Sequence, residues 1–112
     1  MIEVIFRRDS RMRLSSVFAS GHAEIPETSS DEFSLVCAAV SAILQAARLG
    51  LEAHVKLPLD AAQQKGDLSM RWPARAREDE RVLAIVDTAR LAVERIAAQY
   101  PQHVRVTEET EP

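Results

Sequence analysis

The sequence contains one cysteine, Cys37, and a histidine, His22, fifteen residues before it, and this pair has the residue types for thiol chemistry. A thiol with the usual pKa of about 8.5 is mostly protonated at neutral pH, so a nucleophilic cysteine needs a base or a positive field beside it. A histidine at the end of a strand, facing the start of a helix, is placed to accept that proton. The other interpretation is that Cys37 is a small buried hydrophobic residue on an apolar helix. The residue pattern alone leaves both interpretations open.

Two strands and a helix are predicted to position these two side chains. Apolar residues alternate over residues 2–6 and recur over residues 12–19, which predicts a hairpin that ends at Gly21-His22. The apolar period then changes to steps of three and four over residues 36–51, which is typical of a buried helix. Gly50 is expected near the end of this helix.

The second half of the chain repeats this arrangement of strands followed by a helix. Alternating apolar residues predict a third strand over residues 53–59 and a fourth over residues 68–72. Acidic residues 78–80 suit the positive end of a second, long helix, and valines indicate a short last strand at residues 104–106. We therefore predict an α+β fold, with a single mixed sheet of about five strands and two helices in the order β-β-α-β-β-α-β.

Length and charge limit the classes of protein to which this chain can belong. It has 112 residues, of which 46% are hydrophobic, so residues 1–112 are expected to form a single globular domain. Seventeen acidic and fourteen basic residues give a net charge of −3, which argues against nucleic acid as a direct partner. No apolar run approaches the roughly 20 residues that cross a bilayer, and no membrane partner is expected. A lone cysteine cannot form an internal disulfide, so the expected location is the cytoplasm.

The chain resembles the ribosomal-processing cysteine protease (Prp) family in two motifs, Gly21-His22-Ala23 and Val36-Cys37-Ala38-Ala39-Val40-Ser41. Family members carry the first motif after a hairpin and the second at the start of a helix, and the resemblance extends to Tyr100-Pro101 near the other end of the chain. It implies that Cys37 is the nucleophile and His22 the general base of a cysteine endopeptidase without cofactor or metal. The implied substrate is the N-terminal segment of a large-subunit ribosomal protein, and the implied assembly is a homodimer.

Two other functions compete with this one. The first is a non-catalytic member of the same fold that binds a ribosomal or other basic protein. The second is an unrelated small dimeric α+β protein with a buried cysteine, for which the two motifs would be a coincidence.

The start of the helix decides how the helix dipole acts on Cys37. If Ser34 is the N-cap, Cys37 lies in the first turn, where the dipole lowers the pKa of a thiol. We prefer this start, although the family usually has Asp at that position. A start at Ser29, with Glu32 as its capping-box partner, would move Cys37 to the third turn. With Ser at position 34, the carboxylate beside the histidine is either lost or supplied by Asp31 or Glu32.

Further residues are expected to support the site. Gly21 is expected to provide a special backbone geometry. Ser41, one turn after Cys37, either forms a hydrogen bond within the site or bonds a carbonyl of its own helix. The segment between His22 and Cys37 lacks the glycine that is usual in the family. Its four carboxylates either attract a basic peptide or form a solvated surface; they are Glu24, Glu27, Asp31 and Glu32. His54 and His103 are expected to face solvent.

Overall fold

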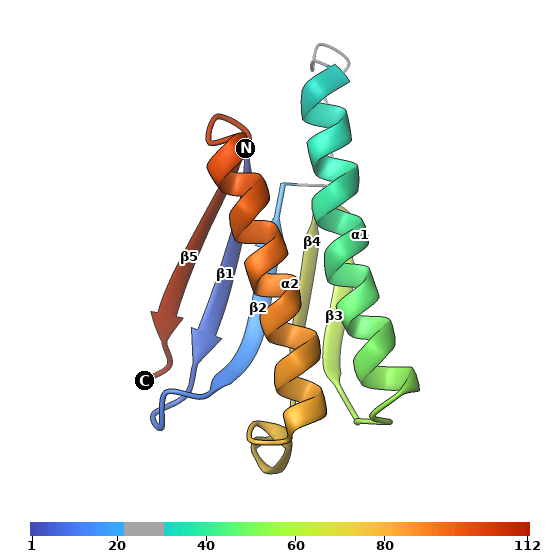
Figure 1. Ribbon diagram of the computed structural model, residues 1–112, viewed down its shortest axis with the longest axis vertical. Helices are drawn as coiled ribbons and strands as arrows, with labels where there is room; N and C mark the ends of the chain where they lie inside the picture. Colours follow the sequence, from blue (N-terminus) through green and yellow to red (C-terminus); the bar gives the residue numbers. More distant parts are fainter. Residues whose placement is uncertain (22–30) are drawn as a thin grey trace.

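Five strands form one mixed sheet in the computed structural model, which describes residues 1–21 and 31–112. The strands are β1 (Ile2–Arg8), β2 (Leu14–Ser20), β3 (Asp60–Gln64), β4 (Asp67–Arg71) and β5 (Val104–Thr110). The helices are α1 (Asp31–Ala53), α2 (Glu80–Gln99) and a short 3₁₀ turn, η1 (Ala74–Ala76). The strand order is β3-β4-β2-β1-β5, and only the pairing of β1 with β5 is parallel. The predicted α+β fold is confirmed (Figure 1).

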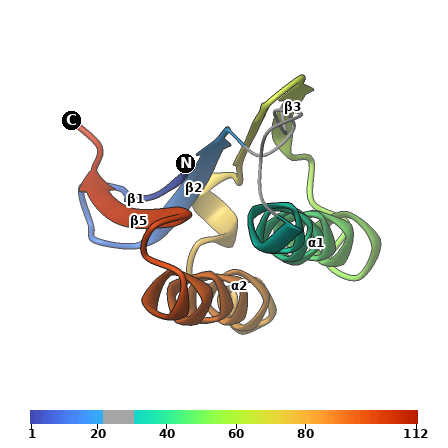
Figure 2. The ribbon, with the colours of Figure 1, turned by 90° about the horizontal axis from the view of Figure 1, so that it is seen from above.

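Both helices cover the same face of the sheet, so that the core lies in a single layer (Figure 2). Alternate residues of β1 point into this layer, and Val4 and Phe6 face Ala19 and Val17 across the β1–β2 pairing. The helices supply aliphatic residues at helical spacing, and Trp72 fills the space at the end of β4. The apolar residues whose spacing predicted the first two strands and the first helix therefore pack together in this layer.

The predicted third strand at residues 53–59 is wrong. Helix α1 continues to Ala53, and Lys56 then takes a left-handed conformation with φ 57°. The N–H groups of His54 and Val55 both donate to the carbonyl of Gly50, which closes the last turn. Residues 55–59 form an irregular connection whose apolar side chains pack on the end of the core, which explains the alternation in the sequence. The third strand follows it as β3.

Gly50 lies in the last turn of α1, near the end of the helix as predicted. A Cβ at this position would stand 3.3 Å from the Cδ1 atom of Ile85 in α2. The glycine therefore also permits a close approach of the two helices.

The second helix begins where the acidic residues predicted. Asp79 is its N-cap, and the Asp79 carboxylate accepts a hydrogen bond from the N–H of Arg81 at 2.8 Å. The helix ends at Gln99, ahead of Pro101. The last strand is longer than predicted, because β5 pairs with β1 along its whole length.

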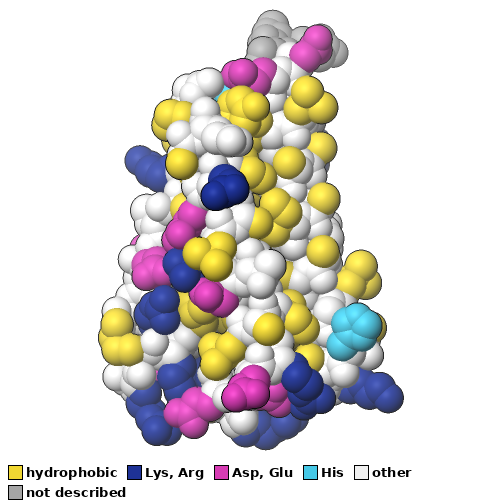
Figure 3. Space-filling view, in the orientation of Figure 1, with side chains coloured by type: hydrophobic (Ala, Val, Ile, Leu, Met, Phe, Trp, Pro, Cys, Tyr) yellow, Lys and Arg dark blue, Asp and Glu magenta, His cyan; other side chains and the backbone are white. Residues whose placement is uncertain are grey.

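The length and apolar composition of α1 would alone suffice for a helix that crosses a membrane, whereas no such segment was predicted from the sequence. The core helix of a soluble protein passes the same test, and seven residues of α1 are buried against the sheet and α2. Its outer side is nevertheless apolar: Leu35 is 71% exposed and Leu49 is 65% exposed. Figure 3 shows apolar side chains along the length of α1. This exposed apolar side suits contact with another protein surface.

Candidate active site

Cys37 lies on α1 with its side chain directed into the core, and only 1% of the residue is exposed. The helix begins at Asp31, so the prediction that Ser34 is the N-cap is wrong and Cys37 is the seventh helical residue. Asp31 and Glu32 occupy the first turn, where their charges suit the helix dipole and favour the earlier start. Because the helix dipole acts mainly within the first turn, it has little effect on the pKa of a thiol in the second turn.

The pKa of the Cys37 thiol is raised above its usual value. Burial is the main cause, since it disfavours the thiolate, and the ammonium group of Met1 partly opposes it. The thiol of the free protein is therefore protonated at neutral pH, as expected for a buried cysteine.

Gly21, at the end of β2, has the special backbone geometry that the sequence predicted. Its φ is +85°, and its N–H donates to the carbonyl of Gly66 in the β3–β4 turn at 2.8 Å. A Cβ at Gly21 would stand 2.6 Å from the carbonyl oxygen of Met1. Met1 thus borders Gly21 while its ammonium group acts on Cys37. The end of β2 and the first half of α1, which carries Cys37, lie at the same end of the sheet (Figure 1).

His22 follows Gly21 directly but lies outside the described residues, as do Glu24 and Glu27. The pairing of His22 with Cys37 therefore stays a prediction.

The other residues expected at the site lie on α1. Ser41 is half-buried one turn after Cys37, and this spacing places the two residues on the same side of the helix. Ser34 is half-buried within the helix. Asp31 is exposed in the first turn, and a separation of six residues turns it about 240° from Cys37 around the helix axis. Asp31 therefore points away from the thiol side of the helix.

A histidine that the sequence analysis placed in solvent contacts the start of α1. Nε2 of His103 lies 2.7 Å from Oε2 of Glu32, and the amide of Gln102 donates to the same oxygen at 3.1 Å. The His103 ring also packs on Phe33, with 5.4 Å between ring centroids. The His103 side chain is only 16% exposed, which makes the prediction for His103 wrong, whereas His54 is exposed as predicted. No local pattern indicates this contact, because it joins residues 71 positions apart.

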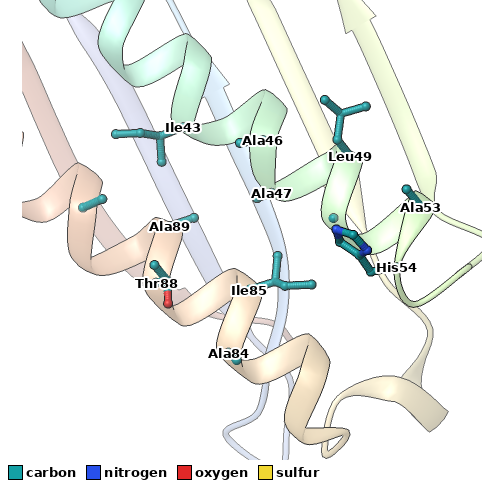
Figure 4. A pocket seen from close by; sticks show the side chains of 12 residues that line it. Ile43, Ala46, Ala47, Leu49, Ala53, His54, Ala84, Ile85, Thr88 and Ala89 are labelled. Carbon is teal, nitrogen blue, oxygen red and sulfur yellow. The ribbon is translucent and has the colours of Figure 1, made fainter.

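A large groove lies between α1 and α2, and Cys37 is not among the residues that line it (Figure 4). It has a volume of about 910 Å³ and is lined mostly by alanine and isoleucine side chains, with Thr88 and His54 as the polar exceptions. A groove of this composition supplies apolar contact area and no nucleophile. It is therefore a candidate for protein contact and not for catalysis.

Comparison with known proteins agrees with the two motifs around His22 and Cys37. A family model described as cysteine protease Prp matches residues 1–105. The chain belongs to the cysteine protease Prp family. No curated protein sequence matches the chain.

Solved structures share the Prp fold. SMU.848 from Streptococcus mutans is 25% identical, with a TM-score of 0.85, over 99% of this chain and 96% of that one. The essential ribosomal processing protease Prp from S. aureus, in complex with a substrate peptide, is 20% identical with a TM-score of 0.83, over 97% of this chain and 100% of that one. The same S. aureus protease with a covalently linked product peptide is 21% identical, with a TM-score of 0.81 and the same coverage.

Proposed function

We propose that this protein is a cytoplasmic cysteine endopeptidase that trims the N-terminal extension of a large-subunit ribosomal protein. Membership of the Prp family supports the class of enzyme. The observation that carries the assignment to residues is the position of Gly21, at the end of β2, and Cys37, in the first half of α1, at the same end of the sheet. His22 follows Gly21 directly in the sequence.

In the proposed mechanism, Sγ of Cys37 attacks the scissile carbonyl carbon while His22 takes the thiol proton. The peptide C–N bond breaks as the same proton passes from His22 to the leaving amine. Water then attacks the thioester, with His22 as base, and releases the Cys37 thiol. Because burial favours the neutral thiol, the proton must leave Cys37 in the peptide complex and not in the free protein.

The charge at the start of α1 suits a basic substrate. Asp31 and Glu32 are exposed at the start of α1, and the chain has a net charge of −3. A ribosomal protein continues from its extension into a basic chain, which acidic side chains attract. The S. aureus protease whose fold this chain shares is known with a substrate peptide, which supports a peptide substrate here.

We further propose that the protein is a homodimer in which the exposed apolar side of α1 and the α1–α2 groove are buried. The groove and the exposed Leu35 and Leu49 form one apolar surface along the helix. A two-fold interface buries such a surface on both copies at once.

One observation favours a second function, a non-catalytic module that binds a ribosomal protein. Cys37 is enclosed in the core and its pKa is raised, as for a structural cysteine. Such a module would bind the same peptide without cutting it.

Hydrolysis of a synthetic peptide that spans the extension separates the two functions. We expect the wild type to cut the peptide at one bond, and the Cys37→Ala and His22→Ala variants to lose the activity by at least about 1000-fold. Binding of the peptide without cleavage by the wild type would favour the module. Ser41→Ala is the matched control on α1, and a loss of less than about tenfold would place Ser41 outside the reacting groups.

A further inference from the structure

The two edges of the sheet differ in their side chains. The edge strand β5 carries charged side chains that pair with β1: Arg7 with Glu109 at 3.3 Å, Arg8 with Glu108 at 3.4 Å, and Arg105 with Glu3. Charged side chains on an edge strand discourage the addition of another strand.

Within the described residues, the opposite edge, β3, has a different character. It pairs only with β4, and four of its five residues are exposed. Its sequence is Asp-Ala-Ala-Gln-Gln, with no proline or lysine, and its register with β4 is continuous from Asp60 to Gln64. A regular, exposed strand edge whose central residues, Ala61 and Ala62, are small and uncharged leaves a row of backbone N–H and C=O groups available for pairing.

The end of β3 leads to the candidate active site. The turn after β3 contains Gly66, whose carbonyl accepts the N–H of Gly21 at 2.8 Å, and His22 is the next residue. Figure 1 shows β3 and β4 as the strands beside α1, the helix that carries Cys37. An extended chain along β3 therefore runs toward the end of the sheet at which Gly21 lies.

We propose that an extended peptide substrate pairs with the free edge of β3 as a sixth strand. This inference rests on the proposed protease function and adds the mode of substrate binding to it. Backbone hydrogen bonds would supply affinity that is largely independent of sequence, as in other cases of strand addition. Ala61 shares its face of the sheet with the buried Met70, so alternate side chains of the added strand would point to the side that α1 covers.

The peptide backbone provides the first test. The Cys37→Ser variant is titrated with a fluorescent peptide that spans the extension, and then with peptides N-methylated at one amide at a time. Strand addition predicts a loss of affinity of about fivefold or more at every second amide, the equivalent of one hydrogen bond, and little change between them. A flat profile, or losses in one continuous block, would overturn the proposal.

Substitutions in β3 provide the second test. The amides of Ala61 and Ala62 point in opposite directions, one to β4 and one to the open edge, because successive residues of a strand alternate. Proline is tolerated where the lost N–H faced solvent, so the variant of Ala61→Pro and Ala62→Pro that keeps the wild-type unfolding midpoint identifies the edge-facing residue. That variant should bind the peptide about fivefold more weakly than the wild type. Val106→Pro and Thr107→Pro in β5 are the matched controls at the other edge. Whichever of these two variants keeps the wild-type unfolding midpoint should bind the peptide with wild-type affinity.

The outcomes separate this inference from the proposed function. Losses of peptide affinity at alternate amides, without cleavage of the peptide by the wild type, would support pairing with β3 and refute the protease function. Cleavage with a flat methylation profile and normal binding by the edge-facing proline variant would refute the pairing alone. If that proline variant becomes monomeric in light scattering while its peptide affinity stays normal, the occupant of the edge is a second copy of the chain, and the proposal is wrong.

Discussion

The carbonyl oxygen of Met1 lies 2.6 Å from the point at which a Cβ atom of Gly21 would stand. Gly21 also has a φ of +85°, which residues with a side chain rarely adopt. The first residue of the chain and the residue before His22 are therefore packed against each other by backbone atoms, which cannot move aside as a flexible side chain can.

The first prediction is that Gly21→Ala destabilises the protein. We expect a loss of at least about 1 kcal/mol in the free energy of unfolding, because the left-handed conformation and the contact with Met1 both oppose a Cβ. Urea denaturation measures the loss. Gly50→Ala is the control: its Cβ would meet only the movable side chain of Ile85, and alanine suits a helix better than glycine. Equal losses in the two variants would refute the explanation.

The second prediction concerns the thiol of the free protein. Its pKa is raised in the folded state, so the folded state favours the protonated thiol, and this contribution to stability is complete below the unfolded pKa of about 8.5. This contribution to stability is lost as the pH rises through the pKa of the Cys37 thiol in the folded state. We expect the free energy of unfolding to fall more steeply above pH 8.5 in the wild type than in Cys37→Ala. Iodoacetamide should also label Cys37 slowly at pH 7 without peptide. Rapid labelling below pH 7 would show a preformed thiolate instead.

The third prediction concerns acid stability, through the buried carboxylate of Asp9. Burial raises the pKa of Asp9, but hydrogen bonds from the Arg13 and Arg11 N–H groups and from the Arg77 guanidinium outweigh burial and hold the pKa well below its usual range. Arg77 Nη1 and Arg13 Nε both lie 3.0 Å from Oδ2 of Asp9. The ionised Asp9 carboxylate therefore contributes to the free energy of unfolding above about pH 4, and this contribution is lost as the pH falls below that value.

We expect Asp9→Asn to be less stable than the wild type at pH 7 and to lose less stability between pH 4 and pH 2. Urea denaturation across this pH range tests both expectations. Glu109→Gln is the control, because Glu109 pairs with Arg7 at the surface and should have little effect on either quantity. Parallel pH profiles for the wild type and Asp9→Asn would contradict the assignment.

The fourth prediction concerns the proposed dimer. Leu49→Arg should convert the dimer into a monomer, because it places a charge in the apolar surface of α1 that would be buried against the second copy. Light scattering measures the mass. Met12→Arg changes a residue of similar exposure in the β1–β2 turn and should leave the dimer intact. A wild type that is monomeric at every concentration would refute the dimer.

The sequence predicted those elements whose signals are local. The hairpin, the buried helix and the acid-capped second helix all appear, since alternation, helical spacing and capping act within a few residues. The third strand was misplaced because the apolar residues at 55–59 pack on the core from an irregular connection, which alternation alone cannot distinguish from a strand. The close approach of Gly50 to Ile85 was not predicted, because Ile85 lies in another helix.

The candidate site was predictable where a motif identified it and not where distant residues meet. Gly21 and Cys37 lie at the same end of the sheet, and Gly21 has the backbone geometry expected of it. The start of α1 was placed four residues late, because Ser34 is a good N-cap while Asp31 and Glu32 also suit the first turn of a helix. The contact of His103 with Glu32 required the fold, since no spacing in the sequence brings the α2–β5 turn to α1.

The most direct measurement is the intact mass of the ribosomal protein precursor after incubation with this protein. We expect the wild type to produce a single new species, shortened by the N-terminal extension, and Cys37→Ser to leave the precursor unchanged. An unchanged precursor with the wild type, or equal cleavage by Cys37→Ser, would contradict the central claim that Cys37 cuts this substrate.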